Sequence, residues 1–399
     1  MHFVNDTMKF MEDRGMRSAT IRVLVVDDST FIRHAIARML SKYPDIEVVG
    51  QARNGEDALA MVRECSPDVM TLDIEMPGMN GLDVLDIIMR ECPMPVIMVS
   101  SLTEDSAKET FRALELGAVD FISKQLDGSL LTITKIETHL IEKIRAAASS
   151  REKIAGLLGT ETSRQNHKYF STVPPETRVA WPRARGHQHA AAHGVDALVV
   201  IGSSTGGPKA IQEILAQWPS AFSCSVLVIQ HMPKFFTKPF AARLHEQCAL
   251  AVCEANDGDC LEAGRVFVAP GGRHLRLESH VGQKVLIRIS SDLTHLPYRP
   301  SVNLAMESAA NIFGDSVIGV VLTGMGNDGE LGMAAIKTAG GRTLVQDEAS
   351  CIVYGMPKAV VAAGHADVVV PLSRMHEEIH KCLVRLIEHQ SARSLEVCG

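Results

Sequence analysis

The sequence lacks any apolar run long enough to cross a membrane. Of its 399 residues, 46% are hydrophobic and 22% are charged, which is an ordinary composition for a globular protein. No stretch reaches the roughly 18 to 20 apolar residues that a membrane helix needs. The first 20 residues, which include Asp6, Glu12 and Asp13, also lack a signal-peptide pattern. We therefore expect a cytoplasmic protein without direct membrane insertion.

A strong net charge and paired cysteines are absent as well. The net charge of −7 is mild for this length, and it disfavours a protein whose main partner is nucleic acid. No helix-turn-helix unit with a basic recognition helix is recognisable in the second half of the chain. The nine cysteines are scattered and never form a C-x-x-C pair. Reduced thiols are therefore expected in place of a disulfide framework or a zinc site.

The order of apolar and helical segments predicts two α/β domains. A chain of 399 residues is too long for one ordinary domain. Apolar runs alternate with helical stretches over residues 21–146 and again over residues 195–388. This alternation is typical of parallel sheets covered by helices on both faces. We therefore expect two doubly wound parallel-sheet domains.

The remaining segments have no steady hydrophobic period. We expect an N-terminal extension over residues 1–20, a linker over 147–194 and a C-terminal tail over 389–399. The linker histidines His187, His189 and His193 fit solvated chain better than a metal site, because no ordered scaffold fixes them. Within the second domain, the alternating runs 265–269, 274–278 and 284–289 predict a strand-turn-strand insertion over residues 264–289.

Polar residues follow several predicted strands of the first domain. Asp27 and Asp28 end the first strand, Asp73 the third, Ser100 the fourth and Lys124 the fifth. The carboxyl ends of parallel strands meet at one edge of a sheet, so these side chains should cluster. Clustered carboxylates favour a hard cation such as Mg²⁺, and one of them could accept a phosphoryl group. A single aspartate could instead cap a helix, but successive strand ends make that interpretation remote.

A serine, a histidine and an aspartate follow three predicted strands of the second domain. Ser204 is the centre of a G-x-S-x-G motif, His231 follows the run 226–229, and Asp328 lies in the turn after the run 317–322. Taken singly, they also fit a helix cap or phosphate loop, a structural histidine and a turn former. Neither a Walker lysine nor a G-x-G-x-x-G motif is present. Together they predict that His231 removes a proton from Ser204 while Asp328 orients the imidazole.

Hydrolysis of this kind needs no cofactor, but it does need donors for the developing oxyanion. The strand-to-helix turn nominates the backbone N–H of Thr205, and Met325 between two glycines could supply a second donor. Arg299 precedes a predicted helix start at Ser301. We expect it to help hold an acidic substrate surface, although a solvated loop arginine is an equally good interpretation.

The first domain resembles a response-regulator receiver domain through residues 25–29, 73–81, 99–101 and 121–124. The resemblance implies a flavodoxin-like fold in which a partner histidine kinase phosphorylates Asp73. It also implies that Asp28, Asp73 and the carbonyl of Glu75 bind Mg²⁺ beside Asp27.

Further residues of the first domain gain roles from the same resemblance. It implies that Ser100 and Phe121 relay the switch and that Lys124 accompanies the phosphorylation site. The sequence departs from the receiver pattern at Gln125, where a proline usually follows this lysine. The cis X-Pro bond that a proline would allow is therefore excluded at this position.

The second domain resembles the chemotaxis protein-glutamate methylesterase family, CheB, through residues 201–208, 230–233, 268–271, 299–302, 322–329 and 346–351. With the receiver, the resemblance covers residues 21–386. It implies a Rossmann-like domain with Ser204 as nucleophile, His231 as general base and acid, and Asp328 as the orienting carboxylate. It further implies demethylation of glutamyl methyl esters, and deamidation of certain glutamines, on the cytoplasmic helices of chemoreceptors.

Two hypotheses from different classes remain. The first is an esterase gated by phosphorylation, in which the unphosphorylated receiver lies over the predicted triad. The second is a non-catalytic signalling module whose second domain only binds a partner or a small ligand. Methanol release from methylated receptors discriminates between them.

Overall fold

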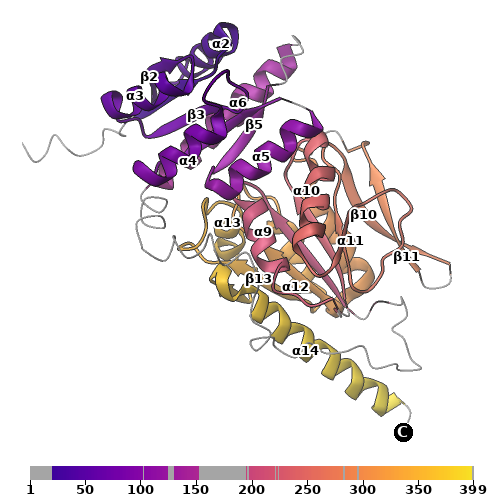
Figure 1. Cartoon of the computed structure of the whole chain (residues 1–399). Helices are drawn as coiled ribbons and strands as arrows, with labels where there is room; N and C mark the ends of the chain where they lie inside the picture. Colours follow the sequence, from indigo (N-terminus) through magenta and orange to yellow (C-terminus); the bar gives the residue numbers. More distant parts are fainter. Residues whose placement is uncertain are drawn as a thin grey trace, which may run out of the picture.

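The computed structural model describes residues 20–101, 103–124, 130–151, 195, 197–220, 222, 224–281, 284–293 and 296–397. They form two α/β parts, drawn in indigo to magenta and in pink to yellow in Figure 1. Residues 1–19, Gln125, residues 152–194 of the predicted linker, and residues 398–399 lie outside the described residues.

The first part contains a five-stranded parallel sheet in the order β2-β1-β3-β4-β5. This order is the flavodoxin-like one, as predicted. Strands β1, β3 and β4 are almost entirely buried because helices cover both faces of the sheet. The strands are β1 (Ile21–Val26), β2 (Ile46–Ala52), β3 (Val69–Asp73), β4 (Val96–Ser100) and β5 (Asp120–Ser123).

Five helices cover this sheet. Helices α2 (Thr30–Leu40) and α6 (Leu130–Ser149) pack on one face, and α3 (Gly55–Cys65), α4 (Gly81–Glu91) and α5 (Glu104–Leu116) pack on the other. Side chains of Ser29, Asn54, Asn80 and Thr103 accept the N-capping hydrogen bonds of the first four helices. Helix α6 continues to Ser149, three residues beyond the predicted domain boundary at 146.

The second part contains a seven-stranded sheet in the order β14-β13-β12-β6-β7-β9-β8, in which every pair is parallel. The direction of winding reverses between β6 and β12, and such a switch point opens a crevice at the carboxyl ends of the strands. The strands are β6 (Leu198–Ser203), β7 (Ser225–Gln230), β8 (Ala251–Glu254), β9 (Arg265–Val268), β12 (Val317–Val321), β13 (Arg342–Gln346) and β14 (Val368–Val370).

Helices cover both faces of the second sheet. Helices α9 (Gly207–Leu215), α10 (Lys234–Gln247) and α14 (Leu372–Val397) lie on one face, and α11 (Val302–Phe313), α12 (Glu330–Thr338) and α13 (Met356–Ala362) lie on the other, with a 3-10 turn (Gly314–Ser316) after α11. Helix α14 extends past the boundary that we expected at residue 388. Among the described helices, none combines the length and apolarity needed to cross a membrane.

The predicted insertion over residues 264–289 is wrong in its first strand. Only β10 (His274–His280) and β11 (Lys284–Ser290) form a separate antiparallel pair, whereas β9 lies between β7 and β8 in the main sheet. With only four residues, β9 is too short for its hydrophobic pattern to distinguish the two settings. The edge strand β8, which is also only four residues long, was not predicted.

The two parts share a buried apolar core where α5 lies beside α10 (Figure 1). Phe111 of α5 stacks on Phe240 of α10 with 5.4 Å between ring centroids. Phe121 of β5 lies 4.4 Å from Phe236 of α10 by the same measure. The interface therefore brings the end strand of the first sheet against a helix of the second part.

Candidate functional site

The turn after β6 contains two adjacent serines, which differ in burial. Ser203 is 0% exposed and donates a hydrogen bond of 2.6 Å to the side-chain oxygen of Gln230. Ser204 is half-buried, and its carbonyl accepts a hydrogen bond of 2.9 Å from the Gln230 amide. The hydroxyl of Ser203 is thus buried and engaged, whereas Ser204 is partly exposed. Sequence reasoning did not single out Gln230, although a polar residue ending a buried strand is a usable signal.

Two glycines allow this turn to pack closely. A Cβ atom on Gly324 would lie 2.8 Å from Cβ of Ser204, and one on Gly207 would lie 2.1 Å from the side-chain oxygen of Gln230. Both distances are shorter than any real contact permits. The loop after β12 therefore lies directly against Ser204.

His231 and Asp328 are joined by a hydrogen bond of 2.8 Å between Nε2 and Oδ2. Their side chains are 11% and 2% exposed. The other ring nitrogen, Nδ1, is buried and has no hydrogen-bond partner among the described residues. His231 adjoins the serine turn, since its backbone N–H donates to the carbonyl of Ser203. The ring is thus reversed relative to the usual serine protease, in which Nδ1 faces the aspartate.

The N-terminus of α11 holds the carboxylate of Asp328. The backbone N–H groups of Val302 and Asn303 donate to it at 2.7 and 2.9 Å, and the hydroxyl of Ser301 donates at 3.2 Å. Burial opposes ionisation, yet the hydrogen bonds from His231, Asn303 and Val302 hold the pKa of Asp328 below its usual value. Asp328 is therefore a fixed anion.

Tyr298 was not predicted, but it lies on the imidazole of His231. The two rings are parallel within 2°, with centroids 4.6 Å apart. The phenol oxygen lies against Gly326, where a Cβ atom would approach it to 2.2 Å. Tyr298 thus contacts both His231 and the loop that carries Asp328. Sequence spacing gives no signal for such a stack.

The predicted oxyanion donors both lie beside Ser204. Thr205 follows it in the chain, and Met325 follows Gly324, which abuts Ser204. No hydrogen-bond acceptor for the backbone N–H of Thr205 or Met325 is present in the described part of the chain. The side chain of Thr205 has a partner, because its hydroxyl donates to the carboxylate of Asp120 in β5.

Arg299 lies next to Tyr298 at the edge of this site. Its carbonyl accepts a hydrogen bond of 3.2 Å from the backbone of Gly272, and its side chain is half-buried. Burial lowers the pKa of His274, and the positive charge of Arg299 acts in the same direction. Arg299 is therefore close to the start of β10.

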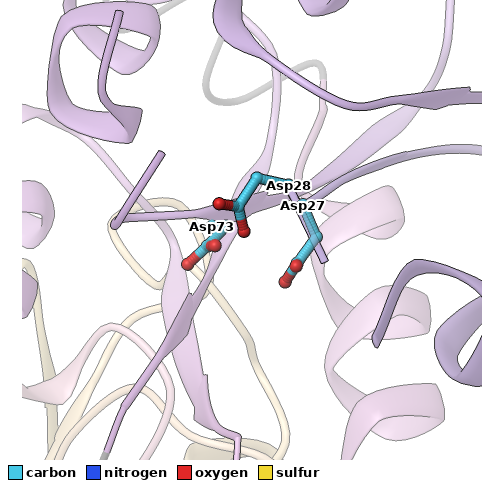
Figure 2. Close-up of side chains that lie close together, drawn as sticks. All are labelled: Asp27, Asp28 and Asp73. Carbon is cyan, nitrogen blue, oxygen red and sulfur yellow. The ribbon is translucent and has the colours of Figure 1, made fainter. Parts of the chain in front are cut away.

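The predicted phosphorylation site forms one cluster. Figure 2 shows Asp27, Asp28 and Asp73 side by side, and their ligand atoms lie within 4.8 Å of one another. Nζ of Lys124 is 2.6 Å from Asp73 and 3.1 Å from Asp27. Two buried carboxylates thus contact one ammonium group, and a third, exposed carboxylate lies beside them. Oxygen ligands with excess negative charge suit a hard divalent cation.

Burial dominates the electrostatics of this cluster. It raises the pKa of Asp73 from 3.8 to about 6; Lys124 opposes this shift and the charge of Asp27 adds to it. Burial also raises the pKa of Asp27, again against Lys124. Burial alone would lower the pKa of Lys124, but the two aspartates raise it above its usual value.

Glu75 and Ser100 lie near this cluster, and both contact α5. The backbone N–H of Glu75 donates to Asp73 at 3.2 Å, while its carboxylate accepts from the hydroxyl of Ser106 at 2.6 Å. The hydroxyl of Ser100 accepts from Thr110 at 2.8 Å. Two short side-chain contacts therefore connect the surroundings of the predicted phosphorylation site with α5.

Phe121, the remaining predicted switch residue, lies in the interface between the two parts. It is 5% exposed and packs on Phe236, and Nζ of Lys143 lies 5.7 Å from its ring centroid. The interface and the predicted switch therefore share this ring.

Comparison with known proteins agrees with this architecture. Residues 23–134 match the response regulator receiver domain, and residues 199–379 match the CheB methylesterase domain. A protein-glutamate methylesterase/protein-glutamine glutaminase of Oleidesulfovibrio alaskensis is 45% identical over 90% of this chain and 98% of its own. A protein of the same name from Pyrococcus abyssi is 40% identical over 92% and 94%.

A solved structure, the CheB methylesterase catalytic domain of Thermotoga maritima, is 40% identical and covers 46% of this chain and 97% of its own, with a TM-score of 0.45. The identity and coverage of the full-length relatives decide the family. The chain belongs to the CheB family of protein-glutamate methylesterase/protein-glutamine glutaminases, with a receiver domain followed by a methylesterase domain.

Proposed function

We propose that this protein is a serine esterase that demethylates glutamyl methyl esters, and deamidates glutamines, on chemoreceptors. The observation that carries the proposal is the hydrogen bond from His231 Nε2 to Asp328, which leaves the buried Nδ1 atom without a partner next to the turn of Ser204. An imidazole oriented by a fixed anion can accept a proton through its free nitrogen.

The proposed reaction has two halves. Ser204 Oγ attacks the side-chain carbonyl carbon while its proton moves to Nδ1 of His231, and the imidazolium returns this proton to the leaving methanol or ammonia. Water then attacks the acyl-serine by the same route and releases the glutamate side chain. The backbone N–H groups of Thr205 and Met325 would bind the oxyanion in both halves, and losing one such donor typically lowers kcat about 100- to 1,000-fold.

Methanol release from methylated receptor membranes tests this assignment. We expect Ser204→Ala to abolish release, because no other hydroxyl replaces the nucleophile. Ser203→Ala is the matched control, since within the described structure its hydroxyl bonds to Gln230, and it should retain most of the activity. Equal release by Ser204→Ala and the wild type would make the catalytic assignment wrong, and no release by the wild type would favour a binding module.

Phosphorylation of Asp73 by a histidine kinase would control access to Ser204. The support is that the receiver contacts the site: Asp120 binds the hydroxyl of Thr205, and burial together with the charge of Glu142 in α6 raises the pKa of Tyr298. A phosphorylated receiver that loosens these contacts would expose the serine. A phosphodonor should therefore stimulate the wild type and leave Asp73→Asn unchanged.

Mg²⁺ fits the receiver cluster. The carboxylates of Asp27, Asp28 and Asp73 would hold it together with the carbonyl of Glu75, because the single positive charge of Lys124, which faces the buried Oδ2 atoms of Asp27 and Asp73, does not balance three carboxylates. When bound, the ion supplies positive charge for the transferred phosphoryl group, and Lys124 adds to it. The esterase half of the molecule would work without a cofactor.

The proposal places the protein in the cytoplasm, with the histidine kinase and the receptors' cytoplasmic helices as partners. Eight cysteines lie in the described part of the chain, and all of them are free thiols. Free thiols are usual in a reducing compartment.

A further inference from the structure

Helix α10 has a second side that the receiver does not cover. Lys234 and Lys238 stand two residues before and two residues after Phe236, which faces the receiver. At 100° per residue, this spacing puts both lysines about 160° from Phe236 around the helix axis. They line a groove of about 310 Å³ together with Phe235, Arg273 of the loop after β9, and Ile289 of β11.

The positively charged side chains of this groove form no ion pairs within the described structure. Lys234, Lys238 and Arg273 are exposed, and none of them forms an ion pair with another described residue. Their ammonium and guanidinium groups are therefore available to an anionic partner.

The two carboxylates at the groove have donors of their own. Glu254 accepts a hydrogen bond of 2.5 Å from the hydroxyl of Thr237. Asp257 accepts one of 2.8 Å from the backbone N–H of Ile289 and lies 3.8 Å from Arg288. Three cationic side chains against these two carboxylates leave the lining of the groove with a net positive charge.

The groove adjoins the predicted triad. Helix α10 begins at Lys234, three residues after His231. Gly271 lines the groove and packs so closely on the chain between them that a Cβ atom there would lie 2.4 Å from the carbonyl oxygen of Met232. Phe235, which is 44% exposed, adds an apolar surface beside the lysines. A chain bound in the groove would therefore continue toward Ser204.

We propose that this groove docks an acidic segment of the protein substrate, next to the glutamyl side chain that enters the triad. Carboxylates of the segment would pair with Lys234, Lys238 and Arg273, and its apolar side would cover Phe235. The inference rests on the proposed function, because the bound segment is part of the same substrate. As the lysines lie across the helix from the receiver, docking does not require phosphorylation.

The test compares two substrates with different charge. One is methylated receptor in membranes, and the other is a short uncharged peptide that carries one glutamate γ-methyl ester. For Lys234→Glu/Lys238→Glu we expect KM for the receptor to rise about 10-fold or more, with kcat within twofold and the peptide unaffected. Lys284→Glu/Lys381→Glu is the matched control, because both lysines are exposed and neither lines the groove.

Co-sedimentation separates docking from chemistry. The Ser204→Ala protein should pellet with receptor membranes, and adding the two groove substitutions should release it. Unchanged binding, or an equal loss of kcat on both substrates, overturns the proposal. So does groove-dependent pelleting with receptor-free vesicles of anionic phospholipid, which would identify a membrane surface as the partner. If the wild type hydrolyses neither substrate, the proposed function fails, while co-sedimentation still decides the docking question.

Discussion

Thr205 donates its hydroxyl hydrogen bond to Asp120, so the turn beside the predicted nucleophile is tied directly to the receiver. Asp120 begins β5 and also pairs with Lys143 of α6. Lys124 directly follows the same strand and contacts Asp73. Five residues, spanning about 13 Å of extended chain, thus connect the proposed phosphorylation site with the turn of the proposed nucleophile.

Breaking the hydrogen bond between Thr205 and Asp120 should activate the unphosphorylated protein. A buried hydrogen bond to a charged group contributes about 1.5–3 kcal/mol. We therefore expect Asp120→Asn, which weakens the bond, and Thr205→Val, which removes the donor but keeps the backbone N–H, to raise basal methanol release, by about 10-fold or more for Thr205→Val. The measurement is made without a phosphodonor.

Two controls accompany this prediction. The Asp120→Asn/Thr205→Val double variant should be no more active than the better single variant, because both changes remove one interaction. Asp45→Asn removes another carboxylate that pairs with α6, through Arg145, and should leave basal activity unchanged. Additive effects in the double variant would show that the two side chains act separately.

A second contact between the parts joins Glu115 of α5 to Arg243 of α10. Burial works against ionisation, but the hydrogen bonds from Arg243 and Gln247 hold the pKa of Glu115 below its usual value. Both partners are partly exposed, so the pair should contribute no more than about 1 kcal/mol. Glu115→Arg should therefore raise basal methanol release about two- to fivefold.

The charge swap is the decisive comparison. Glu115→Arg/Arg243→Glu restores opposite charges across the interface and should return basal activity to the wild-type level. The same swap at the exposed pair Arg63 and Glu91, which lies within the receiver, should change nothing. If the swap remains as active as Glu115→Arg alone, the ion pair does not hold the two parts together.

The strands that carry the site could be predicted because buried parallel strands are continuous apolar runs. That pattern located β6, β7 and β12, and the meeting of their carboxyl ends brought Ser204, His231 and Asp328 to one edge. The same pattern did not identify two short strands correctly: β8 was missed, and β9 was assigned to the insertion.

Contacts between distant segments could not be predicted from the sequence. The reversed ring of His231, the stack of Tyr298 on it and the helix N-terminus that holds Asp328 all depend on how separate elements pack. The bond between Thr205 and Asp120 spans 85 residues and two domains. Neither periodicity nor motif spacing encodes such pairs.

The raised pKa of Asp73 predicts a pH-dependent cost to stability. Its carboxyl group has a pKa of about 6 in the folded protein against 3.8 ordinarily, so the folded state binds more protons between these values. The free energy of unfolding should fall as pH rises from about 4 through 6, by at most about 3 kcal/mol. Asp73→Asn should therefore raise Tm at pH 7.5 and leave it unchanged at pH 4.

Thermal melts with and without Mg²⁺ check this explanation. A bound cation offsets the buried charge, so Mg²⁺ should stabilise the wild type more than Asp73→Asn and reduce the difference at pH 7.5. Asp86→Asn, at an exposed carboxylate paired with Arg90, should show no such pH dependence. If Asp73→Asn and the wild type differ in Tm by the same amount at both pH values, the substitution acts through packing and not through the charge of Asp73.

Tyr298 should act as a positioning residue for His231. An aromatic stack contributes about 0.5–1.5 kcal/mol, so Tyr298→Leu should lower kcat about 3- to 10-fold with little change in KM. Tyr298→Phe keeps the ring and should preserve kcat.

The matched control is Tyr354→Leu. Tyr354 lies at the same edge of the sheet, where its backbone forms a bridge with Gly324, and its ring does not stack on His231 within the described structure. An equal loss of kcat in Tyr354→Leu would reflect altered loop packing. An unchanged kcat in Tyr298→Leu would contradict a positioning role, because the stack on His231 is the contact through which Tyr298 is expected to act.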